Sequence, residues 1–227
     1  MKRMYGEDQI RRFLKFELNS YLRARGGDPI DEQPLARVEN QPYVYYRKGS
    51  LVMYRLQREL GEAAVNRALR TMIRNHAFKG APYPTTLDFL AAIRAEAPAD
   101  KQALITDLFE KITLYDVKTT AATVKKRADG RFDVAVTIDA RKMYSSGKGV
   151  ETAAPMAESL DIGLFTAEPG KKGFDEKAVL LLQPRRITTG VQTLTFVVDK
   201  APKFAGVDPY NTVIDRNGDD NTLKVGG

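Results

Sequence analysis

The hydrophobic pattern of this chain changes its period near Tyr115, and that change restricts the fold more than any other feature. Up to that point apolar residues recur at three- and four-residue spacing, which is the spacing of one face of a helix. Beyond it they alternate with polar residues, which places them on one face of a strand. The clearest examples are Ile10, Phe13, Leu14, Leu18, Tyr21 and Leu22 for a helix and Phe132, Val134, Val136 and Ile138 for a strand. The chain is therefore predicted to be an α+β protein with its helices first.

Glycine and proline divide the first half into a helical array of about five predicted helices with short connections. The predicted helices are one through 10–22 that stops at Gly26-Gly27-Asp28-Pro29, one from Lys48 or Gly49 to Gly61, one from Glu62 to Asn75, one that Thr85 or Thr86 caps, and one after Pro98. A loop through Pro34 and Pro42 separates the first two helices, and Tyr46 is expected near the end of that loop.

The second half reads as a series of short strands separated by turn signals. The predicted strands are 122–126, 131–139, 160–166, 178–183, 193–199 and one near Val213, with a hairpin turn at Asp129-Gly130. Several short strands of this kind predict an immunoglobulin-like antiparallel β-sandwich, although the Cys-Trp-Cys signature of antibody domains is absent. We therefore expect two domains, a helical one at 1–115 and an immunoglobulin-like β-sandwich at 116–227.

The composition excludes several broad classes of protein. With 43% hydrophobic and 29% charged residues, the chain is composed like a globular protein rather than a disordered one. Its longest apolar block, Ala178 to Leu182, is much shorter than the roughly 20 residues of a membrane span, so we expect a soluble segment with no span. The net charge of +7 permits contact with nucleic acid, but the basic residues are interspersed with acidic ones, so we expect no nucleic-acid partner.

One segment has the pattern of catalytic chemistry. It reads Glu39-Asn-Gln-Pro-Tyr-Val-Tyr-Tyr46-Arg-Lys48-Gly49-Ser50 and runs directly into an apolar helix. The chain has a single histidine, His76, and no cysteine, so it cannot contain the H-E-x-x-H zinc helix. We expect neither a metal ligand nor a cofactor-binding residue in this chain.

The chain from Tyr5 to Val225 resembles the C-terminal portion of bacterial gluzincin zinc aminopeptidases of the aminopeptidase N type. Within that family it looks most like enzymes fused behind an ABC-transporter permease. The resemblance is carried by the segment just quoted, by Asp107-Leu-Phe-Glu-Lys-Ile-Thr-Leu-Tyr and by Asp208-Pro-Tyr-Asn-Thr-Val-Ile-Asp-Arg-Asn. It implies that 1–115 is the C-terminal part of a peptidase catalytic domain and that the zinc ligands lie upstream. The chain would then be a piece of a longer, membrane-anchored parent protein, with zinc in the parent and none bound here.

The same resemblance assigns a catalytic role to Tyr46. When zinc-bound water attacks a peptide carbonyl, negative charge develops on the carbonyl oxygen, and a fixed phenol O–H can donate a hydrogen bond to it. For Tyr43 and Tyr45 we expect aromatic packing. Lys48 and Gly49 also match the family phrase but are interpreted structurally, with glycine allowing close backbone approach and lysine solvated or paired.

Two other polar features are interpreted as structural. His76 ends a predicted helix, where a cation suits the carbonyl-rich terminus, and one histidine without cysteine makes no zinc site. The acidic run Asp215-Arg-Asn-Gly-Asp-Asp-Asn221 lacks the sixth-position glycine and the terminal glutamate of an EF-hand, so it is interpreted as turn chemistry rather than a calcium loop.

The sequence leaves two main hypotheses open. The first is the C-terminal portion of a zinc aminopeptidase, which supplies Tyr46 and a wall of the peptide-substrate cleft, joins the rest of the catalytic domain upstream, and is inactive alone. The second is a non-catalytic, peptidase-like interaction module associated with a membrane transporter. A nucleic-acid-binding module is a third possibility that rests on net charge alone.

Overall fold

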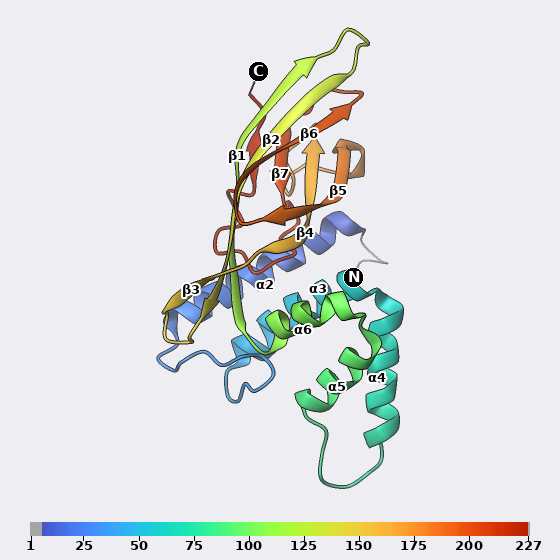
Figure 1. Cartoon of the computed structure of the whole chain (residues 1–227), viewed down its shortest axis with the longest axis vertical. Helices are drawn as coiled ribbons and strands as arrows, with labels where there is room; N and C mark the ends of the chain where they lie inside the picture. Colours follow the sequence, from blue (N-terminus) through green and yellow to red (C-terminus); the bar gives the residue numbers. More distant parts are fainter. Residues whose placement is uncertain (1–5, 227) are drawn as a thin grey trace. The chain divides into compact units, whose positions relative to one another are not determined.

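The computed structural model describes residues 6–226, with the side chains of 7–9 left out of the description, and it divides the chain into two compact units (Figure 1). The β unit comprises the chain up to Asn19 together with 114–143 and 152–227. The helical unit comprises 20–113 and 144–151. The predicted domain boundaries, 1–115 and 116–227, stay a prediction.

In the part of the chain that the structure describes, five α-helices carry the apolar faces that the sequence predicts. They are α2 (Glu7–Gly27), α3 (Gly49–Leu60), α4 (Glu62–His76), α5 (Thr86–Glu96) and α6 (Gln102–Phe109), with a 3₁₀ turn, η2 (Ala99–Lys101), before the last. Gly61 separates α3 from α4 at φ +84°, a left-handed conformation that glycine adopts without a steric penalty. Thr85 and Asp88 form a capping box at the start of α5. The predicted series of helices is confirmed, and the chain is α+β.

One local expectation is wrong. The segment before α3 was expected to be a loop with Tyr46 near its end, whereas Tyr43–Lys48 forms a π-helical turn, η1, that continues directly into α3. The Gly49 N–H donates to the carbonyl oxygens of Val44 and Tyr46, and the first of these bonds has the five-residue span of a π-helix. Because Val44 and Lys48 are both buried, packing holds the turn in a conformation that local sequence preference does not favour.

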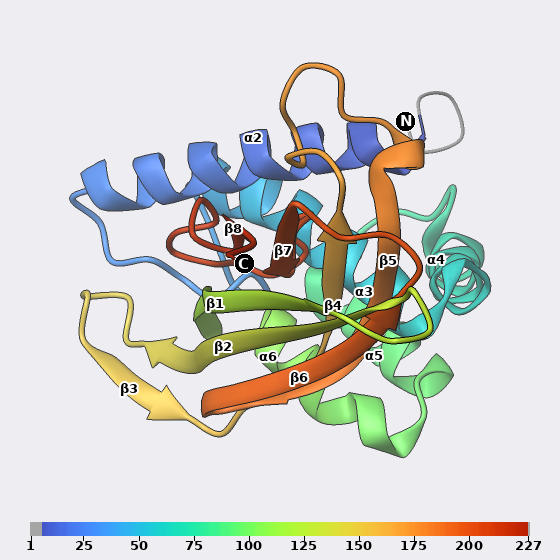
Figure 2. The same cartoon turned by 90° about the horizontal axis from the view of Figure 1, so that it is seen from above.

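The β unit contains two four-stranded sheets. One sheet holds β1 (Ile112–Lys126), β2 (Phe132–Ser145), β3 (Glu151–Ala154) and β6 (Gly190–Val198), and β2 pairs with β6 antiparallel (Figure 2). The other has the order β5-β4-β7-β8, all antiparallel, with bounds Val179–Thr188, Ala157–Phe165, Phe204–Val207 and Thr222–Lys224. Pro184 is tolerated because β5 lies at the edge of its sheet, where a missing N–H does not interrupt the ladder.

The two sheets share one hydrophobic core. Its members include Val134, Val136 and Ile138 from β2, Leu160, Ile162 and Leu164 from β4, Phe196 from β6, and Ala205 and Val207 from β7. The alternation predicted for 132–138 is confirmed, because Val134, Val136 and Ile138 are all buried. The antiparallel sheets agree with the predicted fold class, while the immunoglobulin-like topology stays a prediction.

The strand predictions differ from the structure at Val213 and at three short strands. No strand forms at Val213; the strands near it are β7 and β8, which the sequence analysis did not identify, and β3 was also missed. The reason at Val213 is turn chemistry. The Asp208 carboxylate accepts hydrogen bonds from the N–H groups of Thr212 and Val213, at 2.8 and 3.1 Å, so these groups are not available to a sheet ladder. In addition, β7 and β8 are only four and three residues long, too short for a clear alternation.

None of the helices within 6–226 is long and apolar enough to cross a membrane.

Candidate functional site

Tyr46 lies on the exposed side of the η1 turn in the helical unit. It is 68% exposed, and no residue in the described part of the chain makes a hydrogen bond with its hydroxyl. Its backbone is fixed, because the Ser50 hydroxyl donates to the Tyr46 carbonyl oxygen at 2.8 Å. The Tyr45 ring meets the Tyr46 ring edge-on at 4.8 Å between centroids. The segment therefore presents a phenol O–H to solvent from a helical turn whose carbonyl at Tyr46 is hydrogen-bonded to Ser50.

Lys48 follows Tyr46 by two residues but lies on the buried side of the turn, where it is only 1% exposed. Its ammonium donates to the Glu32 carboxylate at 2.9 Å, and Glu32 is itself buried. The same carboxylate accepts the Tyr21 hydroxyl at 2.7 Å and the Arg25 guanidinium at 2.6 Å. We call these four residues the Glu32 cluster. Both carboxylate oxygens are paired, which is the condition under which a buried ion pair is tolerated.

The pKa values of Lys48 and Tyr21 shift in opposite directions. Burial lowers the pKa of the Lys48 ammonium, and the adjacent Glu32 carboxylate opposes that shift. Burial raises the pKa of the Tyr21 phenol, and the negative charge of Glu32 adds to the effect. The Lys48 ammonium also lies over the Tyr21 ring, 5.5 Å from its centroid. Tyr21 is therefore a neutral hydrogen-bond donor here.

A second buried group connects the cluster with the start of η1. The Gln41 amide nitrogen donates to the Asp28 carboxylate at 3.2 Å and to the Asp31 carbonyl oxygen at 3.1 Å. Its amide oxygen accepts the Gln33 N–H at 2.9 Å. The Gln41 carbonyl oxygen in turn accepts the Val44 N–H. The loop before η1 is thus tied to the turn by side-chain hydrogen bonds as well as by packing.

The other residues of the phrase have structural surroundings. Tyr43 stacks on Tyr21 with 6.1 Å between ring centroids, and its pKa is raised by burial and by the charges of Glu32 and Asp28. Lys48 is paired and buried, which is one of the two expected states. The expectation for Gly49 is wrong: a Cβ there would lie 3.7 Å from the Val44 carbonyl oxygen, an ordinary contact, so close backbone approach does not require glycine.

Sequence reasoning did not identify Glu32, Arg25 or Gln41. The one sequence signal for this cluster was Lys48. A lysine at the start of an apolar helix needs a counter-charge if it is buried, so an acidic partner could have been expected. Several acids before and after Lys48 in the sequence, Glu32, Glu39 and Glu59 among them, were equally eligible, and only the packing of the loop selects Glu32.

The polar features that were interpreted as structural have such roles. His76 ends α4, and its Nε2 lies 3.9 Å from an Asp88 carboxylate oxygen. In the acidic run, Asp215 accepts the Asn217 N–H at 3.1 Å and Asn217 accepts the Asp219 N–H at 3.4 Å, which are turn contacts. Within 6–226 no group of three or more histidine, cysteine, aspartate or glutamate side chains is placed to hold a metal ion.

Comparison with known proteins does not identify a family. No protein-family model matches the chain, and no curated protein is significantly similar to it.

Proposed function

We propose that this chain is the C-terminal portion of a zinc-dependent aminopeptidase, in which Tyr46 stabilises the oxyanion formed on the scissile carbonyl. The observation that carries the proposal is the contrast within one turn of helix. Tyr46 is exposed and its O–H is available, while Lys48 is buried against Glu32 and fixes the turn. A donor that acts on developing charge must be held in place before the reaction, since reorganisation during the reaction would cost free energy.

The π-helical turn supports the same proposal. Single π-helical turns are uncommon and are frequent at functional sites, because they change the direction in which side chains project. In η1 the turn is stabilised by Val44 and Lys48, which are both buried. A role at the surface would explain why a π-helical turn occurs at Tyr46.

Zinc would be held by residues upstream of this chain, and the residues that the structure describes, 6–226 without the side chains of 7–9, supply no ligand set for it. In the parent enzyme zinc would activate the attacking water. The role of this chain would then be to position a neutral phenol and to form one wall of the peptide cleft. The immunoglobulin-like β-sandwich that follows the helices belongs to the same proposal.

Exposed apolar side chains support a large partner on the helical unit. Five of them fall within α4, α5 and the segment joining them: Leu69, Ile73, Phe78, Tyr83 and Leu87. Exposed apolar surface is typical of protein contact sites. We assign it to contact with the remainder of the catalytic domain. An interaction module associated with a membrane transporter is the second candidate, and the same exposed surface favours it.

The two candidates differ in the sequence upstream of Met1. A reading frame that continues upstream with H-E-x-x-H and a later glutamate supports the peptidase. A frame in which those residues are replaced supports the interaction module.

The decisive test uses the complete reading frame. Tyr46→Phe should lower aminopeptidase turnover by about 10²–10³, the usual effect of removing one oxyanion donor, while the zinc content stays unchanged. Tyr45→Phe is the matched control, because Tyr45 is the adjacent tyrosine and its side chain is also exposed, at 40%. It should retain near-normal turnover. Normal turnover of the Tyr46→Phe enzyme with zinc bound would contradict the proposal.

A further inference from the structure

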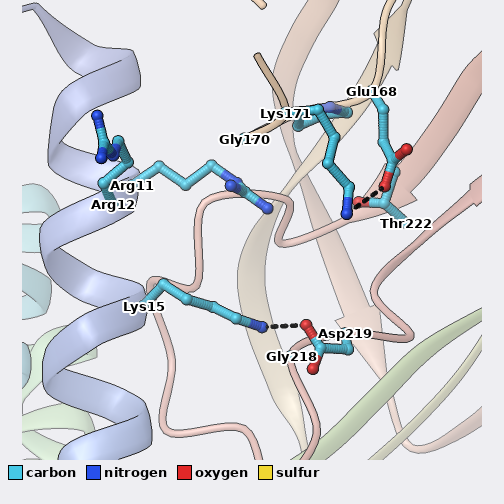
Figure 3. A pocket seen from close by; sticks show the side chains of 10 residues that line it. Arg11, Arg12, Lys15, Glu168, Gly170, Lys171, Gly218, Asp219 and Thr222 are labelled. Carbon is cyan, nitrogen blue, oxygen red and sulfur yellow. Dashed lines mark hydrogen bonds and ion pairs between the residues drawn. The ribbon is translucent and has the colours of Figure 1, made fainter.

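A pocket of about 330 Å³ opens in the β unit, remote in sequence from Tyr46 (Figure 3). It is lined by one face of α2 and by two loops, 168–171 and 218–222. We call it the Arg11 pocket. Its volume is at the lower end of the range for small-molecule sites, about 300–1,000 Å³.

The lining carries an excess of positive charge. Its charged members are Arg11, Arg12, Lys15 and Lys171 on the basic side and Glu168 and Asp219 on the acidic side. Four positive and two negative side chains leave a surplus of two positive charges. Since the cations come from two separate segments, α2 and the 168–171 loop, the surplus arises from the fold rather than from one run of sequence.

Arg11 is the most constrained cation of this set. Its Nε donates to the Pro209 carbonyl oxygen at 2.8 Å, and no other hydrogen bond or carboxylate ion pair is formed by its guanidinium with the described residues. Partial burial lowers its pKa, while Tyr210, Asp219 and Glu168 oppose the shift. A half-buried guanidinium with most of its N–H donors unused is suited to bind an oxyanion.

The 168–171 loop is shaped around this side chain. Gly170 has φ +80°, and a Cβ there would lie 1.5 Å from an Arg11 terminal nitrogen. No side chain could be accommodated at that position without moving the guanidinium. Glycine therefore keeps the loop close to Arg11 and leaves the guanidinium on the pocket wall.

Each of the two acids forms an ion pair that is open to solvent. Lys15 lies 2.5 Å from Asp219, whose side chain is 83% exposed, and Lys171 lies 3.7 Å from Glu168 (Figure 3). Ion pairs of such exposure are typically worth about 0–1 kcal/mol, so an incoming anion can replace the carboxylates at little cost.

We propose that the Arg11 pocket binds a phosphate group, either free or as the phosphomonoester of a small molecule or a lipid headgroup. Arg11 supplies a planar fork of donors to the phosphate oxygens, and Lys15 and Lys171 supply compact charges on either side of it. A dianion matches the surplus of two positive charges. The site is independent of the function proposed for Tyr46.

The test is a titration of the whole chain with inorganic phosphate at low ionic strength, followed by calorimetry. We expect saturable binding in the millimolar range that weakens as salt is added. Arg11→Gln should weaken binding about ten-fold or more, since hydrogen bonds between charged groups are the stronger class. Asp219→Asn should tighten binding, because it removes a competing carboxylate from the pocket.

Two further variants serve as a second test of binding and as a control. Lys171→Gln changes an exposed side chain and should weaken binding even if Arg11→Gln fails to fold. Lys200→Gln is the control, because Lys200 is exposed in the same unit but does not line the pocket. Absence of saturable binding at up to about ten millimolar phosphate, or equal binding by Asp219→Asn, Lys171→Gln and Lys200→Gln, would overturn the proposal.

The source of the phosphate is distinguished with vesicles. Phosphatidylcholine vesicles with and without phosphatidic acid are sedimented with the wild-type chain and with Lys171→Gln. Sedimentation that requires phosphatidic acid and is lost in Lys171→Gln supports a lipid headgroup. Calorimetric binding of phosphate without such sedimentation supports a soluble phosphomonoester.

Discussion

Glu32 in the helical unit and Asp215 in the β unit are both buried carboxylates, yet their surroundings are opposite. Glu32 accepts from Lys48, Arg25 and Tyr21, two of which are cations. Asp215 accepts the Asn217 N–H on one oxygen, while its other oxygen has no hydrogen-bond partner among the described residues. The comparison shows that two carboxylates of similar burial can have very different hydrogen-bond partners.

The consequence for Asp215 is a strongly shifted pKa. Burial raises the pKa of its carboxyl group to about 7, and the negative charges of Asp208 and Asp220 add to the shift, while the Asn217 N–H opposes it. The neutral form is therefore favoured in the native state below neutral pH. In the Glu32 cluster, by contrast, two cations and a phenol donate to the carboxylate.

The largest expected effect comes from breaking the Glu32 cluster. Lys48→Met should lower the free energy of unfolding by about 3–5 kcal/mol, because it removes one partner of a buried ion pair. Chemical denaturation measures this change. The control is Lys148→Met, since Lys148 is 73% exposed and lies 3.6 Å from Asp31, so its loss should be under about 1 kcal/mol. Similar losses in both variants would mean that the cluster does not stabilise the helical unit.

Asp215 should make stability depend on pH in the opposite sense to a paired carboxylate. Its native pKa of about 7 lies above the ordinary value of 3.8, so the folded state binds the extra proton. That contribution is fully present below about pH 4 and is lost as pH rises towards 7. Each pKa unit corresponds to about 1.4 kcal/mol, so the total change is at most about 4 kcal/mol. Asp215→Asn should flatten this part of the stability-pH curve, whereas Asp199→Asn, at an exposed position, should leave it in place.

Asp88, an exposed carboxylate, can be compared with the buried carboxylates of Glu32 and Asp215. Asp88 accepts the Thr85 N–H at 2.7 Å and the Thr85 hydroxyl at 3.0 Å, and these hydrogen bonds lower its pKa. Thr85→Ala removes the N-cap hydroxyl of α5 and should cost about 1 kcal/mol. Thr85→Ser keeps the hydroxyl and should retain most of the stability. Thermal unfolding distinguishes the two, and an equal loss in both would exclude the cap as the cause.

The smallest expected effect is at the rim of the Arg11 pocket. Asp219→Asn breaks the pair with Lys15 but should change the free energy of unfolding by less than about 1 kcal/mol, because Asp219 is 83% exposed. The same variant should bind phosphate more tightly. A large loss of stability would show that this surface pair acts like the buried Glu32 cluster.

Most of the helical unit could be predicted because its signals are local. The start of α5 follows from Thr85 and Asp88, and the break between α3 and α4 follows from Gly61. The β2 strand was predicted for the same reason, since Val134, Val136 and Ile138 alternate within one segment. The short strands β7 and β8 were missed because four and three residues carry too little periodicity.

The candidate site was predicted only in part. Tyr46 was singled out by the phrase around it, and the structure places it on an exposed surface. The π-helical turn and the partners of Lys48 were not predicted. Both depend on which loop residue packs against the turn, and Glu32 lies 16 residues from Lys48 in the chain.

The sequence by itself determined the order of helices before strands, the capped and glycine-limited helix ends, and the segment that contains Tyr46. Each of these depends on residues within a few positions of one another, where backbone geometry fixes the neighbours. Only the tertiary structure decided that Lys48 meets Glu32, that Asp215 is buried near other acids, and that Arg11 faces Gly170. These pairings depend on packing between distant segments, which no local sequence pattern specifies. At Asp215 that packing removes water from the carboxyl group and places it near Asp208 and Asp220, which raises its pKa to about 7.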